Sequence, residues 1–182
     1  NILFEYILKI DKEITLMING FSFEYIDYLM VFLSNKYVWI PLYAYLIYFL
    51  FKFDKNNILK LITICISAVI ISDFITSSIM KPFFERLRPC NNDELLGLID
   101  IVSGCGKKYG FASSHSSTTF SLATIFYYLS KQKFKFLFFW SLAIGYSRIY
   151  LGVHYFGDVV VGIFVGFLTS LIIYRITKKY IS

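Results

Sequence analysis

One segment of the chain combines an arginine, a histidine and an aspartate at spacings that allow them to act together. His154 and Asp158 are four residues apart, so a helix would place them on one face, where the carboxylate can accept the Nδ1 hydrogen of the imidazole. That contact fixes the tautomer and leaves Nε2 as a free base, the form that a nucleophilic histidine needs. Arg148 can offer a planar set of donors to a bound phosphate. A helix-capping histidine beside an unrelated charge is the simpler alternative.

A second polar segment begins a predicted helix. Ser113 or Ser114 is typical of the N-cap position in front of the apolar run that follows. The free backbone N–H groups of such a first turn attract an anion, and His115 within it can protonate a departing oxygen. A serine-rich helix cap with no further role is the alternative.

The third polar segment directly follows an apolar run. Lys81 and Arg88 form a pair of cations near the end of that run, and Pro82 and Pro89 stiffen the backbone around them. Interfacial anchoring of long basic side chains is the alternative. We expect all three segments at one face of the molecule, where they supply two histidines, an aspartate, three cations and a helix N-terminus. A phosphoryl transition state needs an in-line nucleophile, an acid for the leaving group and neutralised equatorial charge.

The elements that must position these residues are long apolar segments. Of the 182 residues, 57% are hydrophobic and 16% charged, and the mean hydropathy is +0.63; soluble domains carry about 25% charged residues. This composition excludes a disordered chain and disfavours a soluble globule. Five apolar runs have the roughly 20 residues of a membrane-spanning helix, or reach that length with a turn from each flank. They are residues 37–51, 61–80, 115–130, 134–146 and 159–174.

The first 35 residues have a different pattern. Apolar residues recur at helical spacing from Ile2 to Ile14 with charged residues between them, which predicts an amphipathic helix in the membrane interface. Asn19-Gly20 predicts a break. Residues 23–33 predict a second short helix, which is either a sixth span or another interfacial helix.

These patterns predict an all-α fold, a polytopic membrane helix bundle of five or six transmembrane helices with an N-terminal amphipathic helix. We expect one membrane-embedded domain over residues 1–182, with 1–35 as the interfacial region and 81–114 as the active-site and lid connection. No short, positively charged N-terminal segment ends in small residues, so no cleavable signal peptide is expected.

Basic residues predict the orientation of the bundle. The links 52–60 and 131–135 and the C-terminal end each carry three Lys or Arg residues. Alternating spans put all three on one side, which the positive-inside rule makes cytoplasmic. The polar segments with chemistry then lie on the outer face. The net charge of +6 is explained by this orientation and by an anionic ligand, and nucleic acid is not expected as a partner.

The three polar segments resemble the signature of a known family. Lys81-x6-Arg88-Pro89 and Ser147-Arg148-x5-His154-x3-Asp158 match in full the pattern of the type-2 phosphatidate phosphatase superfamily, which also contains the vanadium haloperoxidases. Ala112-Ser113-Ser114-His115 is similar to that family's Pro-Ser-Gly-His and departs from it at the first and third positions. The motifs occur in the family's order, with apolar runs flanking them as in its membrane branch.

The resemblance implies a role for each motif residue. His154 would be the nucleophile that forms a phosphohistidine, Asp158 would orient it, and His115 would be the acid for the leaving group. The remaining positions would bind the phosphate: Lys81, Arg88, Arg148, Ser113 and the amide of Ser114. The family's membrane enzymes need no metal or other cofactor, and two histidines without a cysteine or carboxylate cluster make a poor metal site. The serine in place of glycine at position 114 bears on substrate choice more than on the chemistry.

The connection after the first motif is expected to act as a lid or as a headgroup-recognition element. Cys90 and Cys105 both lie in it, on the predicted oxidising side, so we predict that they form a disulfide; two free thiols are the alternative. Asp73 lies within an apolar run, where a carboxylate is costly and usually paired or functional. We expect it to face the bundle interior.

The function implied is an integral membrane lipid phosphatase of the bacterial cytoplasmic membrane, active on the outer face. Candidate substrates by resemblance are undecaprenyl diphosphate, phosphatidylglycerol phosphate, phosphatidate and the lipid A phosphates, and the short chain resembles the undecaprenyl-diphosphate and lipid A phosphatases. A lipid phosphotransferase with the same phosphohistidine intermediate is a second hypothesis. A transporter or lipid-binding protein with an inactive site is a third. The haloperoxidase branch of the superfamily is soluble, so the high hydropathy of this chain disfavours a haloperoxidase. The oligomeric state stays open.

Overall fold

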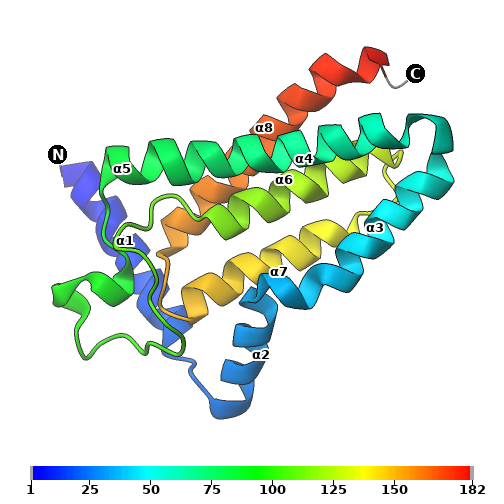
Figure 1. Cartoon of the computed structure of the whole chain (residues 1–182). Coiled ribbons are helices and arrows are strands. Elements are labelled where there is room, and N and C mark those ends of the chain that lie inside the picture. Colours follow the sequence, from blue (N-terminus) through cyan, green and yellow to red (C-terminus); the bar gives the residue numbers. More distant parts are fainter. Residues whose placement is uncertain (1, 181–182) are drawn as a thin grey trace.

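A computed structural model describes residues 2–180. Within those residues the chain forms eight α-helices and no β-sheet, with Leu87 and Tyr109 paired in an isolated antiparallel bridge. The all-helical membrane bundle expected from the sequence is confirmed, and so is the break after Asn19 (Figure 1). The helices are α1 (Ile2–Asn19), α2 (Glu24–Ser34), α3 (Ile40–Phe53), α4 (Ile58–Phe74), α5 (Lys81–Phe84), α6 (Ser114–Leu129), α7 (Phe136–Tyr150) and α8 (Phe156–Thr177).

Within the described part of the chain, two helical segments are long and apolar enough to cross a membrane by themselves. In the first, a π-helical turn joins α4 to α5, so that Lys55–Phe84 forms one 30-residue rod. The second is Phe156–Tyr180, with 25 residues. The bent pair α1 and α2 qualifies only if both count as one span.

The other helices of the bundle are shorter. α3, α6 and α7 have 14, 16 and 15 residues, about 21–24 Å at 1.5 Å per residue. They match a hydrocarbon core of roughly 30 Å only with their flanking turns. The number of spans, five or six, therefore stays a prediction.

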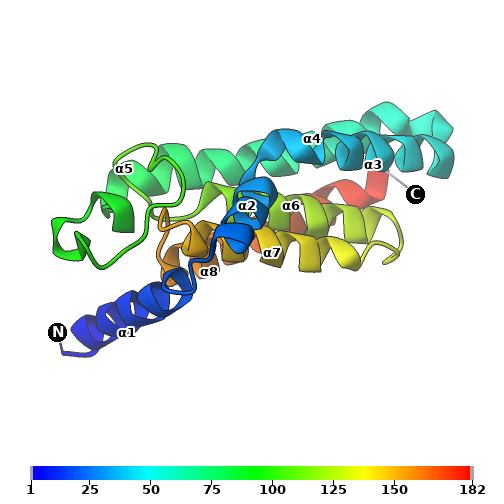
Figure 2. The same ribbon diagram turned by 90° about the horizontal axis from the view of Figure 1, so that it is seen from below.

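Helix α6 lies at the centre of the bundle, packed against α4, α7 and α8 (Figures 1 and 2). Small residues allow α8 to approach it closely: a Cβ atom on Gly166 would lie 2.1 Å from the carbonyl oxygen of Ser117. The hydroxyls of Ser121 and Ser170 bond across the same interface at 2.7 Å. Small residues and hydroxyl pairs are a common means of joining helices in membranes. The two helices run parallel, so their N-terminal ends are held side by side.

The apolar residues occupy both the interior and the outer surface. A buried cluster joins α3, α4, α6 and α7, and its members include Leu61, Ile125, Phe126, Leu137 and Trp140. On the outside, the side chain of Ile70 is 60% exposed and that of Phe139 is 74% exposed. Large apolar side chains over so much of the surface suit contact with lipid rather than with water.

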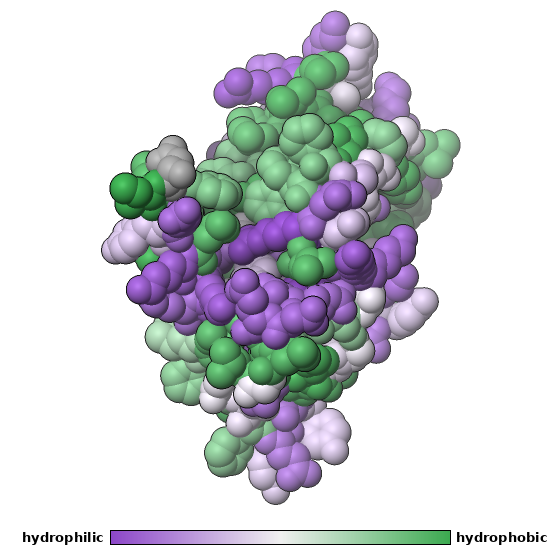
Figure 3. Space-filling model, turned by 90° about the vertical axis from the view of Figure 1, so that its left-hand side faces the viewer, coloured by the Kyte–Doolittle hydropathy of each residue, from purple (hydrophilic) through white to green (hydrophobic). Residues whose placement is uncertain are grey.

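The two ends of the bundle differ in polarity. Residues 85–113 lie at the end that also holds α1, and Cys90 and Cys105 are joined there in the predicted disulfide. A view of this end shows hydrophilic residues gathered in a band between apolar areas (Figure 3). Helix α1 buries three polar residues of one face, Asp11, Thr15 and Asn19.

Replacing Gly166 by alanine is expected to lower the apparent melting temperature in detergent. The new methyl group would overlap the main chain of α6, and overpacking of this kind costs roughly 1–3 kcal/mol. Gly104→Ala is the matched control, because no atom of residues 2–180 lies within 4 Å of a Cβ atom at that position. Thermal scanning fluorimetry measures both variants. An unchanged melting temperature for Gly166→Ala would contradict the packing described for α6 and α8.

Candidate active site

The structure brings the eight residues singled out by the sequence motifs to one end of the bundle, on the left of Figure 1. Lys81 opens α5, Arg88 follows in the connection, Ser113, Ser114 and His115 start α6, Arg148 lies in the last turn of α7, and His154 and Asp158 flank the start of α8. Direct contacts join the three segments. The amide of Ser113 donates to the carbonyl oxygen of Asp158 at 2.9 Å, and the guanidinium of Arg88 lies 3.4 Å from Nε2 of His154.

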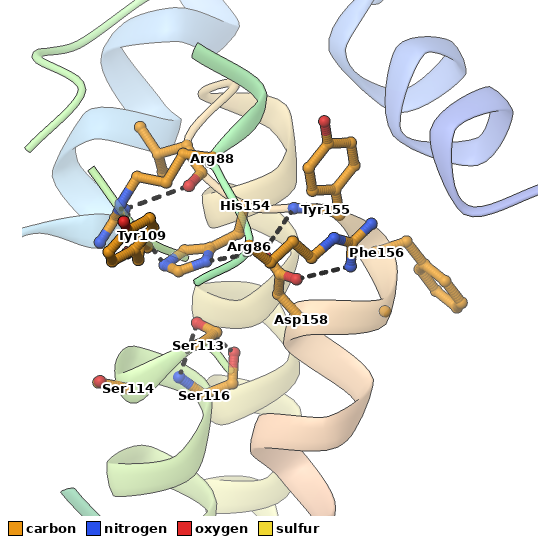
Figure 4. Close-up of polar contacts among 12 residues, drawn as sticks. Arg86, Arg88, Tyr109, Ser113, Ser114, Ser116, His154, Tyr155, Phe156 and Asp158 are labelled. Atoms are coloured by element: carbon orange, nitrogen blue, oxygen red, sulfur yellow. Dashed lines mark hydrogen bonds and ion pairs between the residues drawn. The ribbon is translucent and has the colours of Figure 1, made fainter. Parts of the chain in front are cut away.

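His154 and Asp158 form the buried pair that their spacing indicated. Nδ1 of His154 lies 3.2 Å from Oδ2 of Asp158, and the side chains are 2% and 0% exposed (Figure 4). The local backbone differs from the expected helical face, because His154 lies in the turn before α8. Asp158 is the third residue of α8 and also accepts the backbone N–H of Tyr155 at 3.1 Å, in a capping box. The capping box of α8 thus fixes the carboxylate of Asp158, which is hydrogen-bonded to the imidazole of His154.

The surroundings of His154 keep its imidazole neutral. It lies outside the helical spans, and burial with the positive charges of Arg88 and Arg148 lowers the pKa of His154 well below its ordinary range. We assign the single ring proton to Nδ1, because the carboxylate of Asp158 accepts there. Nε2 then carries a lone pair at neutral pH, which is the state required of a nucleophile.

Three cationic side chains around this imidazole lack an acidic partner. Within residues 2–180, neither Lys81, Arg88 nor Arg148 forms a salt bridge. Arg88 is 9% exposed and donates to the carbonyl oxygens of Tyr109 and Val153 at 3.3 and 3.2 Å. Buried positive charge is unfavourable unless an anion accompanies it. The site is therefore complementary to an anion with several acceptor oxygens.

Of these three cationic side chains, Arg148 has a buried N–H donor that is not used in a hydrogen bond among residues 2–180. One terminal nitrogen donates to the hydroxyl of Ser34 in α2, whereas Nε is buried and has no hydrogen-bond partner in the described part of the chain. Buried polar groups are rarely left without a partner. An oxygen of a bound phosphate would satisfy this N–H.

The first turn of α6 supplies further polar groups. Ser113 is the N-cap, as one of the two sequence alternatives proposed, and its hydroxyl accepts from the amide of Ser116 at 3.4 Å (Figure 4). The hydroxyl of Ser114 accepts a hydrogen bond from Nζ of Lys81 and lies 2.8 Å from the hydroxyl of Ser77. The serine that replaces the expected glycine therefore restrains a lysine, and does so through its side chain.

Next to His115 lies a cavity of about 180 Å³ with polar groups in its wall. Ser34, Lys36 and Asp73 line it together with Ser114 and His115. Asp73 accepts from the hydroxyl of Ser77 at 3.0 Å, so the carboxylate expected to face the bundle interior does so at this cavity.

An apolar groove of about 560 Å³ continues from the polar cavity between α3, α4 and α6. Lys36, Tyr43, Thr118 and Thr119 line both spaces. The polar cavity can thus hold the headgroup of a lipid while the adjoining groove holds its apolar chains.

Two residues that the sequence interpretation left without a role reach the centre of the site. Arg86 donates from Nη1 to Oδ1 of Asp158 at 2.8 Å and from Nη2 to Oδ2 of Asp11 at 2.6 Å. The sequence signal was present: Asp11, Thr15 and Asn19 form a polar stripe at i, i+4 and i+8 on an otherwise amphipathic helix. Within residues 2–180, no three His, Cys, Asp or Glu side chains form a group that could hold a metal ion.

Comparisons with known proteins agree with this geometry. The family model described as PAP2 superfamily matches residues 57–182. A lipid A 4'-phosphatase of Porphyromonas gingivalis is 33% identical over 176 residues, which cover 94% of this chain and 75% of that protein. A lipid A 4'-phosphatase of Bacteroides thetaiotaomicron is 32% identical over 180 residues, which cover 96% of this chain and 80% of that protein.

Two solved structures share the fold. The crystal structure of Aquifex aeolicus LpxE has a TM-score of 0.67 and 27% sequence identity, with 90% of this chain and 93% of that chain covered. The PAP2-type phosphatidylglycerolphosphate phosphatase of Bacillus subtilis has a TM-score of 0.72 at 18% identity, with 96% and 87% covered. The second likeness concerns the fold alone.

The chain therefore belongs to the PAP2 superfamily, and the family resemblance inferred from the motifs is confirmed. It is a membrane lipid phosphatase.

Inorganic phosphate is expected to bind the three cations and to stabilise the protein. At ten times its Kd, a ligand of the folded state adds about 1.4 kcal/mol to the free energy of unfolding. Arg88→Gln should abolish most of this gain, whereas Arg175→Gln should keep it, because Arg175 is exposed near the far end of α8. Thermal scans with increasing phosphate measure the effect. An equal gain in the Arg88 variant would refute the assignment of Arg88 to the anion site.

Proposed function

We propose that the protein hydrolyses a phosphate monoester on the sugar headgroup of a lipid A-type substrate, at the outer face of the bacterial inner membrane, through a phosphohistidine on His154. The observation that carries the proposal is a buried imidazole in hydrogen-bond contact with a carboxylate, beside three cations that form no salt bridge within residues 2–180. A phosphate monoester supplies the missing negative charge and the electrophile in one group.

In the first step, Nε2 of His154 attacks phosphorus, the N–P bond forms and the P–O bond to the lipid breaks. Lys81, Arg88 and Arg148 neutralise the charge on the three equatorial oxygens, and the amide at the start of α6 adds a donor. The negative charge of the bound phosphate favours the protonated form of His115. The departing alkoxide takes that proton from His115, and the lipid leaves as an alcohol.

In the second step, water attacks the phosphohistidine. His115, now neutral, accepts a proton from that water, the N–P bond breaks and inorganic phosphate leaves. Asp158 keeps the Nδ1 hydrogen in place throughout, so that Nε2 is the atom that is phosphorylated and released.

The leaving-group side of the site supports the choice of lipid. The cavity beside His115 offers the side chains of Ser34, Lys36 and Asp73, which suit the hydroxyl and amide groups of an acylated amino sugar. The adjoining apolar groove suits acyl chains. The curated relatives named above are lipid A 4'-phosphatases.

The distribution of basic residues supports the outer face. The links 52–60 and 131–135 and the C-terminal end lie at the end of the bundle opposite the site (Figure 1). The positive-inside rule assigns such an end to the cytoplasm.

His154→Ala is expected to lower turnover by at least about a thousandfold, as does removal of a nucleophile elsewhere. Purified enzyme in detergent is assayed for phosphate release from bisphosphorylated lipid A, undecaprenyl diphosphate, phosphatidylglycerol phosphate and phosphatidate. Lipid A should be hydrolysed fastest, and rapid quenching in alkali should trap a phosphoenzyme in the wild type only. Transfer of the phosphate to an acceptor lipid in place of release would identify a phosphotransferase. Normal release by the His154 variant would exclude the mechanism.

His115→Ala is expected to slow lipid hydrolysis strongly and to slow hydrolysis of an aryl phosphate much less. An aryl alcohol is acidic enough to leave without a proton donor, so loss of the acid matters less for it. The ratio of the two rates in wild type and variant measures the effect, with Arg175→Gln as the control. Equal losses with both substrates would exclude His115 as the leaving-group acid.

A further inference from the structure

Helix α1 is attached to the turn that carries His154 through a line of buried polar side chains. Oδ1 of Asp11 accepts from the amide of Gly157 at 2.6 Å, and Oγ1 of Thr15 accepts from the amide of Phe156 at 3.0 Å. One turn further, Nδ2 of Asn19 donates to the carbonyl oxygen of Tyr150 at 2.7 Å. The first amides of a helix have no partner within it, so α1 caps α8 from a distant part of the chain.

Arg86 connects this docked helix to the buried carboxylate of the site. Its guanidinium donates to Oδ1 of Asp158 at 2.8 Å and to Oδ2 of Asp11 at 2.6 Å. The guanidinium carbon lies 4.0 Å from the ring centre of Tyr155, the N-cap residue of α8. A planar group held at two edges and over one face has a defined orientation.

The two oxygens of Asp158 depend on different donors. Oδ2 accepts from His154 and from the amide of Tyr155, whereas Oδ1 accepts only from Arg86 among residues 2–180. Asp158 is 0% exposed, so water cannot replace a lost donor without rearrangement. Without Arg86, Oδ1 would be buried without a donor, which is unfavourable. Rotation of the carboxylate would let Oδ1 share the donors of Oδ2, and the imidazole of His154 would lose its fixed partner.

The contact between α1 and α8 is also close. A Cβ atom on Gly157 would lie 3.0 Å from Oδ2 of Asp11. Any larger residue at position 157 would move the carboxylate that holds Arg86. The opposite side of α1 carries exposed apolar side chains, with Tyr6 60% and Met17 60% exposed, so the same helix can lie in lipid while its polar stripe holds the turn.

We propose that Arg86 is a positioning residue of the phosphatase reaction, and that Asp11 of α1 holds Arg86 against Asp158 so that His154 stays in line with the phosphate. This inference rests on the proposed role of His154 as the nucleophile. In this arrangement the guanidinium of Arg86 is occupied by Asp158 and Asp11, and neither Arg86 nor Asp11 is assigned to the phosphate. Arg86 therefore acts on kcat through Asp158 and leaves substrate affinity to the other cations.

The test compares Arg86→Gln, Arg86→Lys, Asp11→Asn and the double variant Asp11→Asn with Arg86→Gln. Asparagine at position 11 keeps an oxygen for the amide of Gly157 and removes the charge that Arg86 needs. Lys12→Gln is the matched control, because Lys12 is on the same helix and, among the described residues, pairs only with the exposed Glu94. Full-length enzyme in detergent is assayed with bisphosphorylated lipid A for kcat and KM, and thermal scans check folding.

Arg86→Gln is expected to lower kcat by roughly 10- to 100-fold, by analogy with the loss of hydrogen-bond partners that orient metal-binding histidines, with KM changed less than about threefold. Asp11→Asn should lower kcat less, and Arg86→Lys should restore part of the loss. The double variant should be no slower than Arg86→Gln alone, because both residues act through one contact. Lys12→Gln should match the wild type.

Normal kcat in a folded Arg86→Gln variant would overturn the proposal, and so would additive losses in the double variant. A rise in KM with unchanged kcat would overturn it by making Arg86 a substrate-binding residue. If Arg86→Gln does not fold, Arg86→Lys and Asp11→Asn decide by the same criteria. His154→Ala separates the two hypotheses: if it remains active, the proposed mechanism fails, whereas loss in His154→Ala with normal Arg86 variants rejects the positioning role alone.

Discussion

A carboxylate that is closed off from water needs hydrogen-bond donors for both of its oxygens, and much of the structure is arranged to meet this need at Asp158. One oxygen is held by the imidazole of His154 and by the cap of α8, and the other by Arg86. Arg86 in turn needs Asp11 of α1. The orientation of the imidazole is thus fixed by a carboxylate whose own position depends on parts of the chain more than seventy residues away.

The positive charges beside this pair, in contrast to the carboxylate, have neutral hydrogen-bond partners. Lys81, Arg88 and Arg148 are held by hydroxyl and carbonyl groups, and none of them forms a salt bridge with an acidic side chain of residues 2–180. Neutral partners fix the position of a cation without cancelling its charge, so the site keeps an unsatisfied attraction for an anion. A neutral imidazole fits the same environment, because protonation would add a further positive charge to it. In the proposed mechanism, preference for a phosphate group and activation of His154 as the nucleophile therefore have one electrostatic cause.

The membrane environment explains why these groups are on helix ends. Backbone polar groups within a bilayer must be satisfied internally, which favours helices and puts irregular chain at their ends. Small residues lock α8 to the central helix α6 as a parallel pair. The first turns of α6 and α8 consequently lie at the same level of the bundle. They bring His115 and Asp158 together, although these are forty-three residues apart in the sequence. The apolar groove at α3 and the polar cavity beside His115 extend this end toward the lipid.

Sequence reasoning was sufficient wherever short spacings or long apolar runs carry the information. Motif spacing identified the eight residues that meet at the site, apolar runs predicted the helices, and the placement of Cys90 and Cys105 in one connection predicted their disulfide. The count of spans was not fixed, because helices of 14 to 16 residues are too short for length alone to decide.

The contacts that only the tertiary structure decided share a physical origin. His154 precedes α8 instead of lying on it, because the capping box turns the chain there. Arg86 with Asp11, and Arg148 with Ser34, join residues 75 and 114 positions apart. The periodicity of a sequence records whether a side chain faces apolar or polar surroundings. Which partner it meets there is set by how the helices pack against one another, and that is a property of the assembled bundle.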